Sequence, residues 1–129
     1  MNKNLIAVYG SLRKKLGNHR LIEDSKYLGT FNSEPTFNLY SLGSFPGLQN
    51  NGETSVVMEV YEVDDITAKR VDQLEGYSPN RPATFYDKQT IQTPYGEAGV
   101  YIYMGNPSKN SLVKSGDWFE FLQEKYSYS

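Results

Sequence analysis

The segment from Thr54 to Val63 limits the possible folds of this chain more than any other, because its side chains alternate in character. Val56, Met58 and Val60 fall on one face, and the polar Glu59 between them falls on the other. A period of two residues is typical of a β-strand that buries one face. The segment therefore predicts a strand in the middle of the chain and argues against a helical bundle.

Five further runs of β-forming residues, separated by turn residues, indicate more strands. They occupy residues 5–9, 26–31, 36–42, 84–92 and 97–103. The last two runs should form a hairpin around the Thr-Pro-Tyr-Gly turn at 93–96. By composition, residues 12–17, 32–35, 43–47, 50–52 and 78–82 are expected to be loops or turns. The chain should therefore contain six or seven strands.

A helix is expected directly after the central strand. Asp64 or Asp65 can cap its first turn, and Gly76 fits its end. Its apolar side chains fall roughly on one face, which we expect to be buried: Ile66, Val71 and Leu74.

Two more helical segments are expected nearer the ends of the chain. Asn18 is a candidate N-cap for a short segment that reaches Asp24. Asp117 is a candidate N-cap for a final helix. The side chains of that helix that should face the core are Trp118, Phe121 and Leu122.

Together these elements predict an α+β fold with a mostly antiparallel sheet, either curled or closed into a small β-barrel, and two or three short helices. The chain has 129 residues. This length suits one domain with one core, so we expect a single domain over residues 1–129.

Composition excludes several classes of function. The 13 Lys and Arg residues against 15 Asp and Glu give a net charge of −2, which counts against a dedicated nucleic-acid binder. The absence of cysteine excludes disulfides, thiolate metal sites and thiol catalysis, and suits a reducing compartment. A single histidine leaves no imidazole cluster for zinc. The apolar runs are too short to span a bilayer, and the first residues do not resemble a signal peptide. We therefore expect a cytoplasmic protein with no metal and no membrane partner.

Common motifs for hydrolysis and phosphate binding are missing from the sequence. Ser11 follows a glycine, but residues 9–13 lack the Gly-x-Ser-x-Gly elbow. His19, the only possible imidazole base, lies in a polar loop. Nothing matches Gly-x-x-x-x-Gly-Lys-Ser/Thr. Adjacent carboxylates such as Asp64 and Asp65 diverge, so helix caps or solvated pairs explain them better than a metal site.

The turn after the first strand is the first candidate site. It consists of Tyr9, Gly10, Ser11 and Leu12. A glycine at the end of a buried strand lets successive backbone N–H groups point into one concavity, which can bind a carboxylate or a developing oxyanion. The alternative is an ordinary strand-ending turn.

Glu75 is the second candidate, because it lies at the end of the expected helix just before Gly76. The negative end of the helix dipole raises the pKa of a carboxyl there, and burial among tyrosines would raise it further. A carboxyl that titrates near neutrality can shuttle protons. The alternative is a solvent-facing glutamate at a helix end.

Taken in order, short motifs along nearly the whole chain resemble the γ-glutamylcyclotransferase-like superfamily, which includes AIG2-like proteins and γ-glutamylamine cyclotransferases. The motifs are Tyr-Gly-Ser-Leu-Arg (9–13), Phe-Pro-Gly-Leu (45–48), Glu-Val-Tyr-Glu-Val (59–63), Val-Asp-Gln-Leu-Glu-Gly-Tyr (71–77), Tyr-Asp-Lys (86–88), Ala-Gly-Val-Tyr (98–101) and Ser-Gly-Asp-Trp (115–118). Three positions depart from the family pattern: Met58 replaces a common glycine, Gly99 a common tryptophan and Lys88 the usual arginine. These departures bear on the shape of the pocket and the substrate.

The resemblance implies a small β-barrel-like α+β fold with one pocket, in which a γ-glutamyl compound cyclises to 5-oxoproline and releases an amine. Glu75 would be the general acid and base, and the backbone from Tyr9 to Leu12 would hold a carboxylate or carbonyl oxygen of the substrate. Neither a metal nor a cofactor is required, because the nucleophile is the substrate's own α-amine. Tyr86 and Tyr101 are further pocket candidates, with ordinary strand packing as the alternative.

Three functions remain open from the sequence. The first is a γ-glutamyl cyclotransferase that acts on a γ-glutamyl amine or a γ-glutamyl amino acid. The second is a divergent acyltransfer or lyase reaction in the same pocket. The third is a non-enzymatic small-molecule binding protein, which an exposed or salt-bridged Glu75 would favour.

Overall fold

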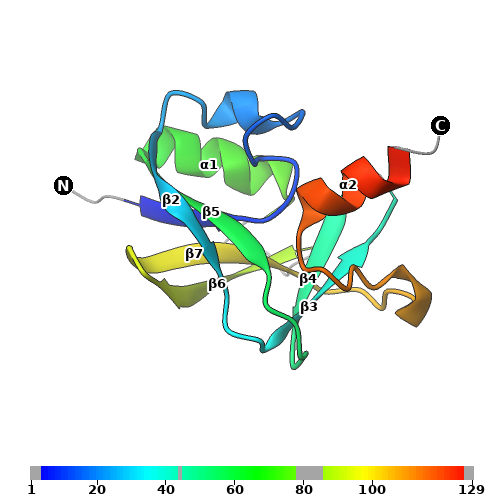
Figure 1. Cartoon of the computed structure of the whole chain (residues 1–129). Coiled ribbons are helices and arrows are strands. Elements are labelled where there is room, and N and C mark those ends of the chain that lie inside the picture. The colour runs from blue at the N-terminus through cyan, green and yellow to red at the C-terminus, as the bar shows by residue number, and fades with distance from the viewer. Residues whose placement is uncertain (1–3, 44, 78–85, 127–129) are drawn as a thin grey trace.

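The computed structural model describes residues 4–43, 45–77 and 86–126, and its main feature is a curled five-stranded sheet (Figure 1). The strand order is β2 (Lys26–Asn32), β5 (Val57–Val63), β1 (Asn4–Val8), β7 (Gly96–Tyr103) and β6 (Tyr86–Thr93). Neighbouring strands are antiparallel except for β1 and β7. The prediction of a mostly antiparallel α+β fold is confirmed, and the strands that contain Val8, Val60, Thr90 and Tyr101 lie in one sheet.

The alternative of a closed β-barrel is wrong, because β2 and β6 remain separate edges of the sheet. In place of main-chain pairing, a side-chain contact joins the β6–β7 hairpin to β2. Tyr95, in the turn between β6 and β7, packs on Gly29 of β2, where an added Cβ would lie 1.9 Å from the tyrosine hydroxyl oxygen. The absence of a side chain at Gly29 therefore permits this close approach of Tyr95.

A second, two-stranded sheet consists of β3 (Phe37–Ser41) and β4 (Pro46–Asn50). The prediction of a loop over residues 43–47 is wrong at its end, because Pro46 and Gly47 begin β4. Proline fits the first position of a strand. Gly47 is needed for packing, since an added Cβ would lie 2.9 Å from Cβ of Tyr103. Leu48 then pairs with Leu39, and both are completely buried.

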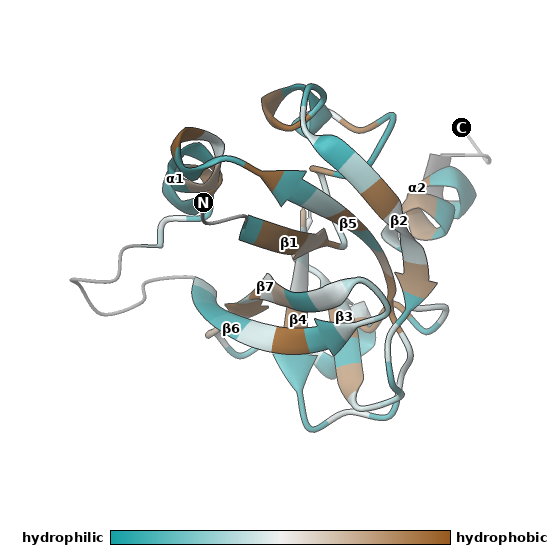
Figure 2. Cartoon of the chain, turned by 90° about the vertical axis from the view of Figure 1, so that its left-hand side faces the viewer, coloured by the Kyte–Doolittle hydropathy of each residue, from teal (hydrophilic) through white to brown (hydrophobic). Residues whose placement is uncertain are grey.

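Apolar residues pack on both faces of the large sheet. Figure 2 shows the largely hydrophobic β1 between β5 and β7. On one face, residues of β3, β4 and the C-terminal helix join Val56, Met58 and Val60. On the other face, helix α1 and the segment after β1 cover Tyr61 and Val63. The alternating side chains expected over residues 54–63 thus belong to two apolar clusters, one on each face of the sheet.

Helix α1 (Asp65–Leu74) begins and ends where the sequence predicted. The Asp64 carboxylate accepts a hydrogen bond from the backbone N–H of Thr67 at 2.7 Å, and Gly76 has a φ of 71° at the end. Its predicted buried face is confirmed at Val71 but wrong at the other two positions, because Ile66 is 65% exposed and Leu74 is 43% exposed. The buried side chains are Ala68 and Val71, which lie three residues apart on one stripe of the helix.

The final helix, α2 (Trp118–Tyr126), also follows the prediction. The Asp117 carboxylate accepts a hydrogen bond from the N–H of Glu120, and Trp118 is buried with Phe121 and Leu122 packed at the core. Near the N-terminus the predicted helix is only a single 3₁₀ turn, η1 (His19–Leu21), and a second one is η2 (Lys109–Ser111). Across the described residues, no helix has both the length and the apolar character required to cross a membrane.

Candidate active site

A cavity of about 400 Å³ opens where β1 ends, which is a size typical of small-molecule sites. The end of β1, the turn that follows it, the start of β4 and the end of α1 contribute to its wall. Each site residue predicted from the sequence lines this cavity: Tyr9, Gly10, Ser11, Leu12, Glu75, Tyr86 and Tyr101. The topology therefore brings together segments that are far apart in the chain.

The turn after β1 presents three consecutive backbone N–H groups. In the described part of the chain, no group accepts a hydrogen bond from the N–H of Gly10, Ser11 or Leu12. The turn also lies close to the start of β4, because a Cβ on Gly10 would be 2.6 Å from Cγ of Pro46. Three consecutive amides of residues that line the cavity therefore lack an acceptor within the described part of the protein.

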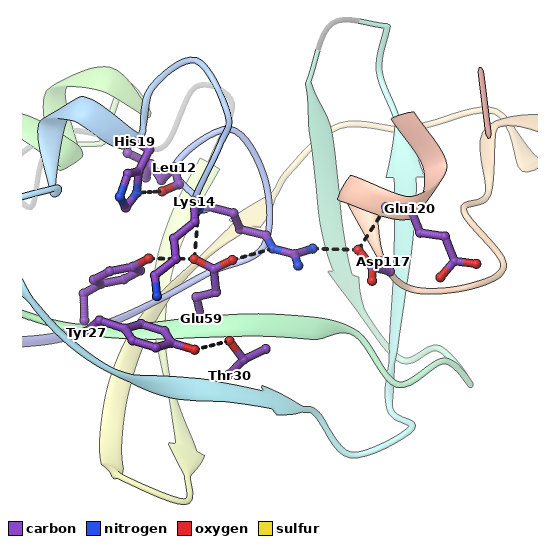
Figure 3. Close-up of polar contacts among 10 residues, drawn as sticks. Leu12, Lys14, His19, Tyr27, Thr30, Glu59, Asp117 and Glu120 are labelled. Carbon is purple, nitrogen blue, oxygen red and sulfur yellow. Dashed lines mark hydrogen bonds and ion pairs between the residues drawn. The ribbon is translucent and has the colours of Figure 1, made fainter. Parts of the chain in front are cut away.

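Arg13 fixes the far side of this turn through two carboxylates. Its Nε lies 3.0 Å from Oε2 of Glu59, and its Nη1 lies 2.8 Å from Oδ1 of Asp117. Figure 3 labels these two carboxylates. The other oxygen of Glu59 accepts hydrogen bonds from the Lys14 N–H and the Tyr61 hydroxyl. The loop expected at 12–17 is thus anchored by a buried arginine. The sequence held one signal for this, a glutamate on the polar side of the central strand.

Two side chains of the segment after the turn, Asn18 and His19, form hydrogen bonds with residues of the turn. The Asn18 amide donates to the Ser11 hydroxyl at 2.8 Å, instead of capping the 3₁₀ turn as predicted. Nδ1 of His19 lies 2.9 Å from the carbonyl oxygen of Leu12 (Figure 3). A carbonyl only accepts, so this nitrogen carries the proton. The single histidine therefore supports the turn structurally.

Three tyrosines form a wall of the cavity, and their hydroxyl groups are already engaged. Tyr9 donates to the carbonyl of Tyr101 at 2.7 Å, and Tyr86 donates to the carbonyl of Pro46 at 2.8 Å. The hydroxyl of Tyr101 donates to a carboxylate oxygen of Asp72. Burial raises the pKa of all three phenols above their ordinary value, so they stay neutral.

Glu75 occupies the position between the last residue of α1 and Gly76. Burial raises the pKa of its carboxyl to about 7. Within the described residues, the carboxylate has no hydrogen bond or ion pair, and its charge contributes to the raised pKa values of Tyr9, Tyr86 and Tyr101. It therefore lies within electrostatic reach of the three hydroxyl groups. Such a carboxyl can both accept and donate a proton at neutral pH.

Acidic and imidazole side chains elsewhere are dispersed. Among the side chains that the structure describes, no group of three or more His, Asp or Glu is arranged to hold a metal ion. The polar part of the cavity lining includes the turn at Gly10 and Ser11, the side chains of Asn18 and Gln73, and the carboxyl of Glu75.

Comparisons with known proteins match most of the chain. A model of the family described as "Gamma-glutamyl cyclotransferase, AIG2-like" matches residues 6–120. A relative from Vibrio cholerae is 41% identical over 116 residues, which cover 90% of this chain and 96% of the relative. The gamma-glutamylcyclotransferase family protein YtfP of Escherichia coli is 40% identical over 116 residues, with 89% and 96% covered.

Solved structures share the fold. The crystal structure of an uncharacterized protein from Pyrococcus horikoshii has a TM-score of 0.82 at 28% identity, and the match covers 97% of this chain and 98% of the other. An AIG2-like protein from mouse has a TM-score of 0.73 at 21% identity, with 92% and 89% covered. The mouse protein supports the fold alone at this level of identity.

Proposed function

Because the chain belongs to the AIG2-like gamma-glutamyl cyclotransferase family, we propose that it converts a γ-glutamyl amine or γ-glutamyl amino acid into 5-oxoproline and a free amine. The observation that carries this proposal is the Glu75 carboxyl, whose pKa is raised to about 7 in a cavity that is also lined by three residues whose backbone amides have no acceptor among the described residues. A proton shuttle and an oxygen-binding turn are the two parts that the cyclisation needs.

In the proposed reaction, Glu75 first takes a proton from the α-ammonium group of the substrate. The free amine then attacks the γ-carbonyl carbon of the same molecule and closes a five-membered ring. When the bond from this carbon to the leaving nitrogen breaks, the protonated Glu75 returns its proton to the departing amine. The ring nitrogen gives its second proton to water, and the released amine takes one up as an ammonium ion, so the protons balance. The carboxyl ends in its starting state, and the nucleophile is supplied by the substrate.

The turn from Gly10 to Leu12 is proposed to hold the oxygens of the substrate. Its amides can bind the α-carboxylate, or the oxyanion that develops at the γ-carbonyl during ring closure. The rings of Tyr9, Tyr86 and Tyr101 would enclose the γ-glutamyl group and limit its contact with water. Their hydroxyl groups are bonded to protein acceptors, so we assign the proton transfer to Glu75.

The test is release of 5-oxoproline from a panel of γ-glutamyl amines and γ-glutamyl amino acids. We expect turnover of at least one substrate by the wild type and a rate about 10²–10⁴-fold lower for Glu75→Gln, which keeps the shape but cannot shuttle a proton. Glu97→Gln is the matched control, because Glu97 is an exposed carboxylate at the start of β7.

Two outcomes would contradict the proposal. Equal rates for the wild type and Glu75→Gln would remove Glu75 as the proton shuttle. A folded wild type that turns over no member of the panel would indicate a binding protein or a divergent acyltransfer or lyase enzyme. Affinity for the substrate should survive in Glu75→Gln, because the turn amides are unchanged.

A further inference from the structure

Side chains from three elements meet on a single carboxylate beside the cavity. Nζ of Lys88, on β6, lies 3.0 Å from Oδ1 of Asp72 on α1. The hydroxyl of Tyr101, on β7, donates to the same oxygen, and Nζ lies 5.6 Å from the centre of the tyrosine ring. The side chains of Lys88 and Asp72 are 25% and 19% exposed, so the ion pair is largely shielded from water.

The register of the β6–β7 hairpin builds this contact. Lys88 and Tyr101 are directly opposite each other, and opposite residues of an antiparallel pair share one face of the sheet. Gly99 lies two residues away on the same face, and a Cβ there would be 2.9 Å from Cε of Lys88. Because glycine has no side chain, the Lys88 side chain can cross β7 at Gly99 and reach Asp72 on α1.

The ion pair lies next to the candidate proton shuttle. Asp72 and Glu75 are three residues apart at the end of α1, and residues at this spacing are neighbours on a helix. The charges of both carboxylates contribute to the raised pKa of Tyr101, so its hydroxyl lies within electrostatic reach of each. An uncompensated charge on Asp72 would therefore disfavour ionisation of Glu75.

The other titratable groups around Glu75 come from the neighbouring elements. In the described residues these are Tyr9 after β1, Tyr86 on β6 and Tyr101 on β7, and Tyr77 follows on the same segment. The three cavity tyrosines stay neutral, because their pKa values are raised. Among the described residues, the contacts of Tyr101 bring two charged groups to this cluster, the Asp72 carboxylate and the Lys88 ammonium.

We propose that Lys88 is a positioning residue of this site: its ammonium group neutralises Asp72, which keeps a second negative charge from acting on Glu75 and ties the end of α1 to the β6–β7 hairpin. The inference rests on the proposed function for its catalytic consequence, since Glu75 is there the proton shuttle. Its electrostatic part concerns the ionisation of Glu75 and can be measured without any substrate.

The experiment follows the titration of the Glu75 carboxyl by ¹³C NMR of protein with labelled glutamate, with the signal assigned from its loss in Glu75→Gln. In Lys88→Met the charge of Asp72 is uncompensated, so the titration midpoint of Glu75 should rise. In Asp72→Asn the charge of Lys88 is uncompensated, so the midpoint should fall. Each change should be about one pH unit for charges at this spacing in a partly shielded site.

The opposite directions separate the charge effect from loosening of the helix. Loosening alone would expose Glu75 to water and lower its midpoint in both variants. The double variant Lys88→Met/Asp72→Asn and the rescue variant Lys88→Arg should both stay near the wild-type value. Lys114→Met, which removes an exposed lysine outside the cavity, should not change it. A midpoint in Lys88→Met that is unchanged or lower would overturn the inference.

The activity assay then distinguishes this inference from the proposed function. If the wild type releases 5-oxoproline, the lower limb of its pH–rate profile should move with the NMR midpoint in each variant. Opposite NMR changes in a protein that turns over no γ-glutamyl substrate would support the electrostatic role and overturn the proposed function. If the protein turns over a substrate and its pH–rate profile is the same in Lys88→Met and Asp72→Asn as in the wild type, the role of Lys88 is overturned and the proposed function stands.

Discussion

Nε of Arg13 lies 3.0 Å from Oε2 of Glu59, and the two side chains are only 9% and 7% exposed. This buried ion pair joins the turn that lines the cavity to β5. Through Asp117, the same guanidinium also contacts the N-terminus of α2. The shape of the candidate oxygen-binding turn therefore depends on a residue outside the cavity wall.

We first predict that Arg13→Met lowers the free energy of unfolding by about 3–5 kcal/mol, because removal of one partner leaves a buried carboxylate without its counter-charge. Urea unfolding measures the change. Lys114→Met, at an exposed position, should alter stability by less than about 0.5 kcal/mol. If the two variants unfold alike, the ion pair does not anchor the turn.

A second prediction concerns the close contact between the turn and β4. In Gly10→Ala the new Cβ would lie 2.6 Å from Cγ of Pro46, so the turn or β4 must shift. We expect a loss of about 1–3 kcal/mol of stability from this overpacking, together with a higher KM for the substrate. Gly17→Ala is the matched control, because an added Cβ there meets nothing within 4 Å. Thermal melts and steady-state kinetics compare the two, and equal behaviour would argue against the contact.

A third prediction separates structural from chemical roles for the hydroxyl of Tyr86. In Tyr86→Phe the buried carbonyl of Pro46 loses its donor, so stability should fall by about 1–3 kcal/mol. Tyr27→Phe, at a partly exposed tyrosine, should change stability by less than about 0.5 kcal/mol. Turnover by Tyr86→Phe below its melting range should stay within about tenfold of the wild type. A loss of about 10²-fold or more, the scale of acid–base catalysis, would instead assign chemistry to this hydroxyl.

Much of the fold could be predicted because the relevant signals are local. The alternation over residues 54–63 and the turn at 93–96 each depend on neighbours in sequence. The cap at Asp64 and the helix end at Gly76 likewise involve residues a few positions away. Local backbone preferences therefore predict where these elements begin and end.

The remaining features depend on contacts between distant parts of the chain. Arg13 pairs with residues 46 and 104 positions away, so its burial has no local signal. Pro46 and Gly47 have the composition of a loop and become a strand because β3 and Tyr103 are beside them. The buried stripe of α1 is narrow because Leu74 is at the cavity, where part of its surface remains exposed. Packing across the molecule decided each of these cases.

The last prediction concerns the dependence of stability on pH at Glu75. Burial raises the pKa of this carboxyl from 4.5 to about 7, so between these values the folded state binds more protons than the unfolded state. Stability must then fall as the pH rises through this window. A change of this size corresponds to at most about 3 kcal/mol, since one pKa unit is about 1.4 kcal/mol.

Glu75→Gln removes this titration, so the variant should equal the wild type in stability near pH 4 and exceed it by about 1–3 kcal/mol at pH 8. The lowered pKa of Asp64 acts in the opposite sense, but it is present in both proteins and cancels in their difference. Urea unfolding at half-unit pH intervals gives the difference curve, and its midpoint should fall between pH 4.5 and 7. A difference independent of pH would mean that Glu75 titrates at its ordinary value. The carboxyl would then be fully ionised at neutral pH, and the physical basis for its proton shuttle would be lost.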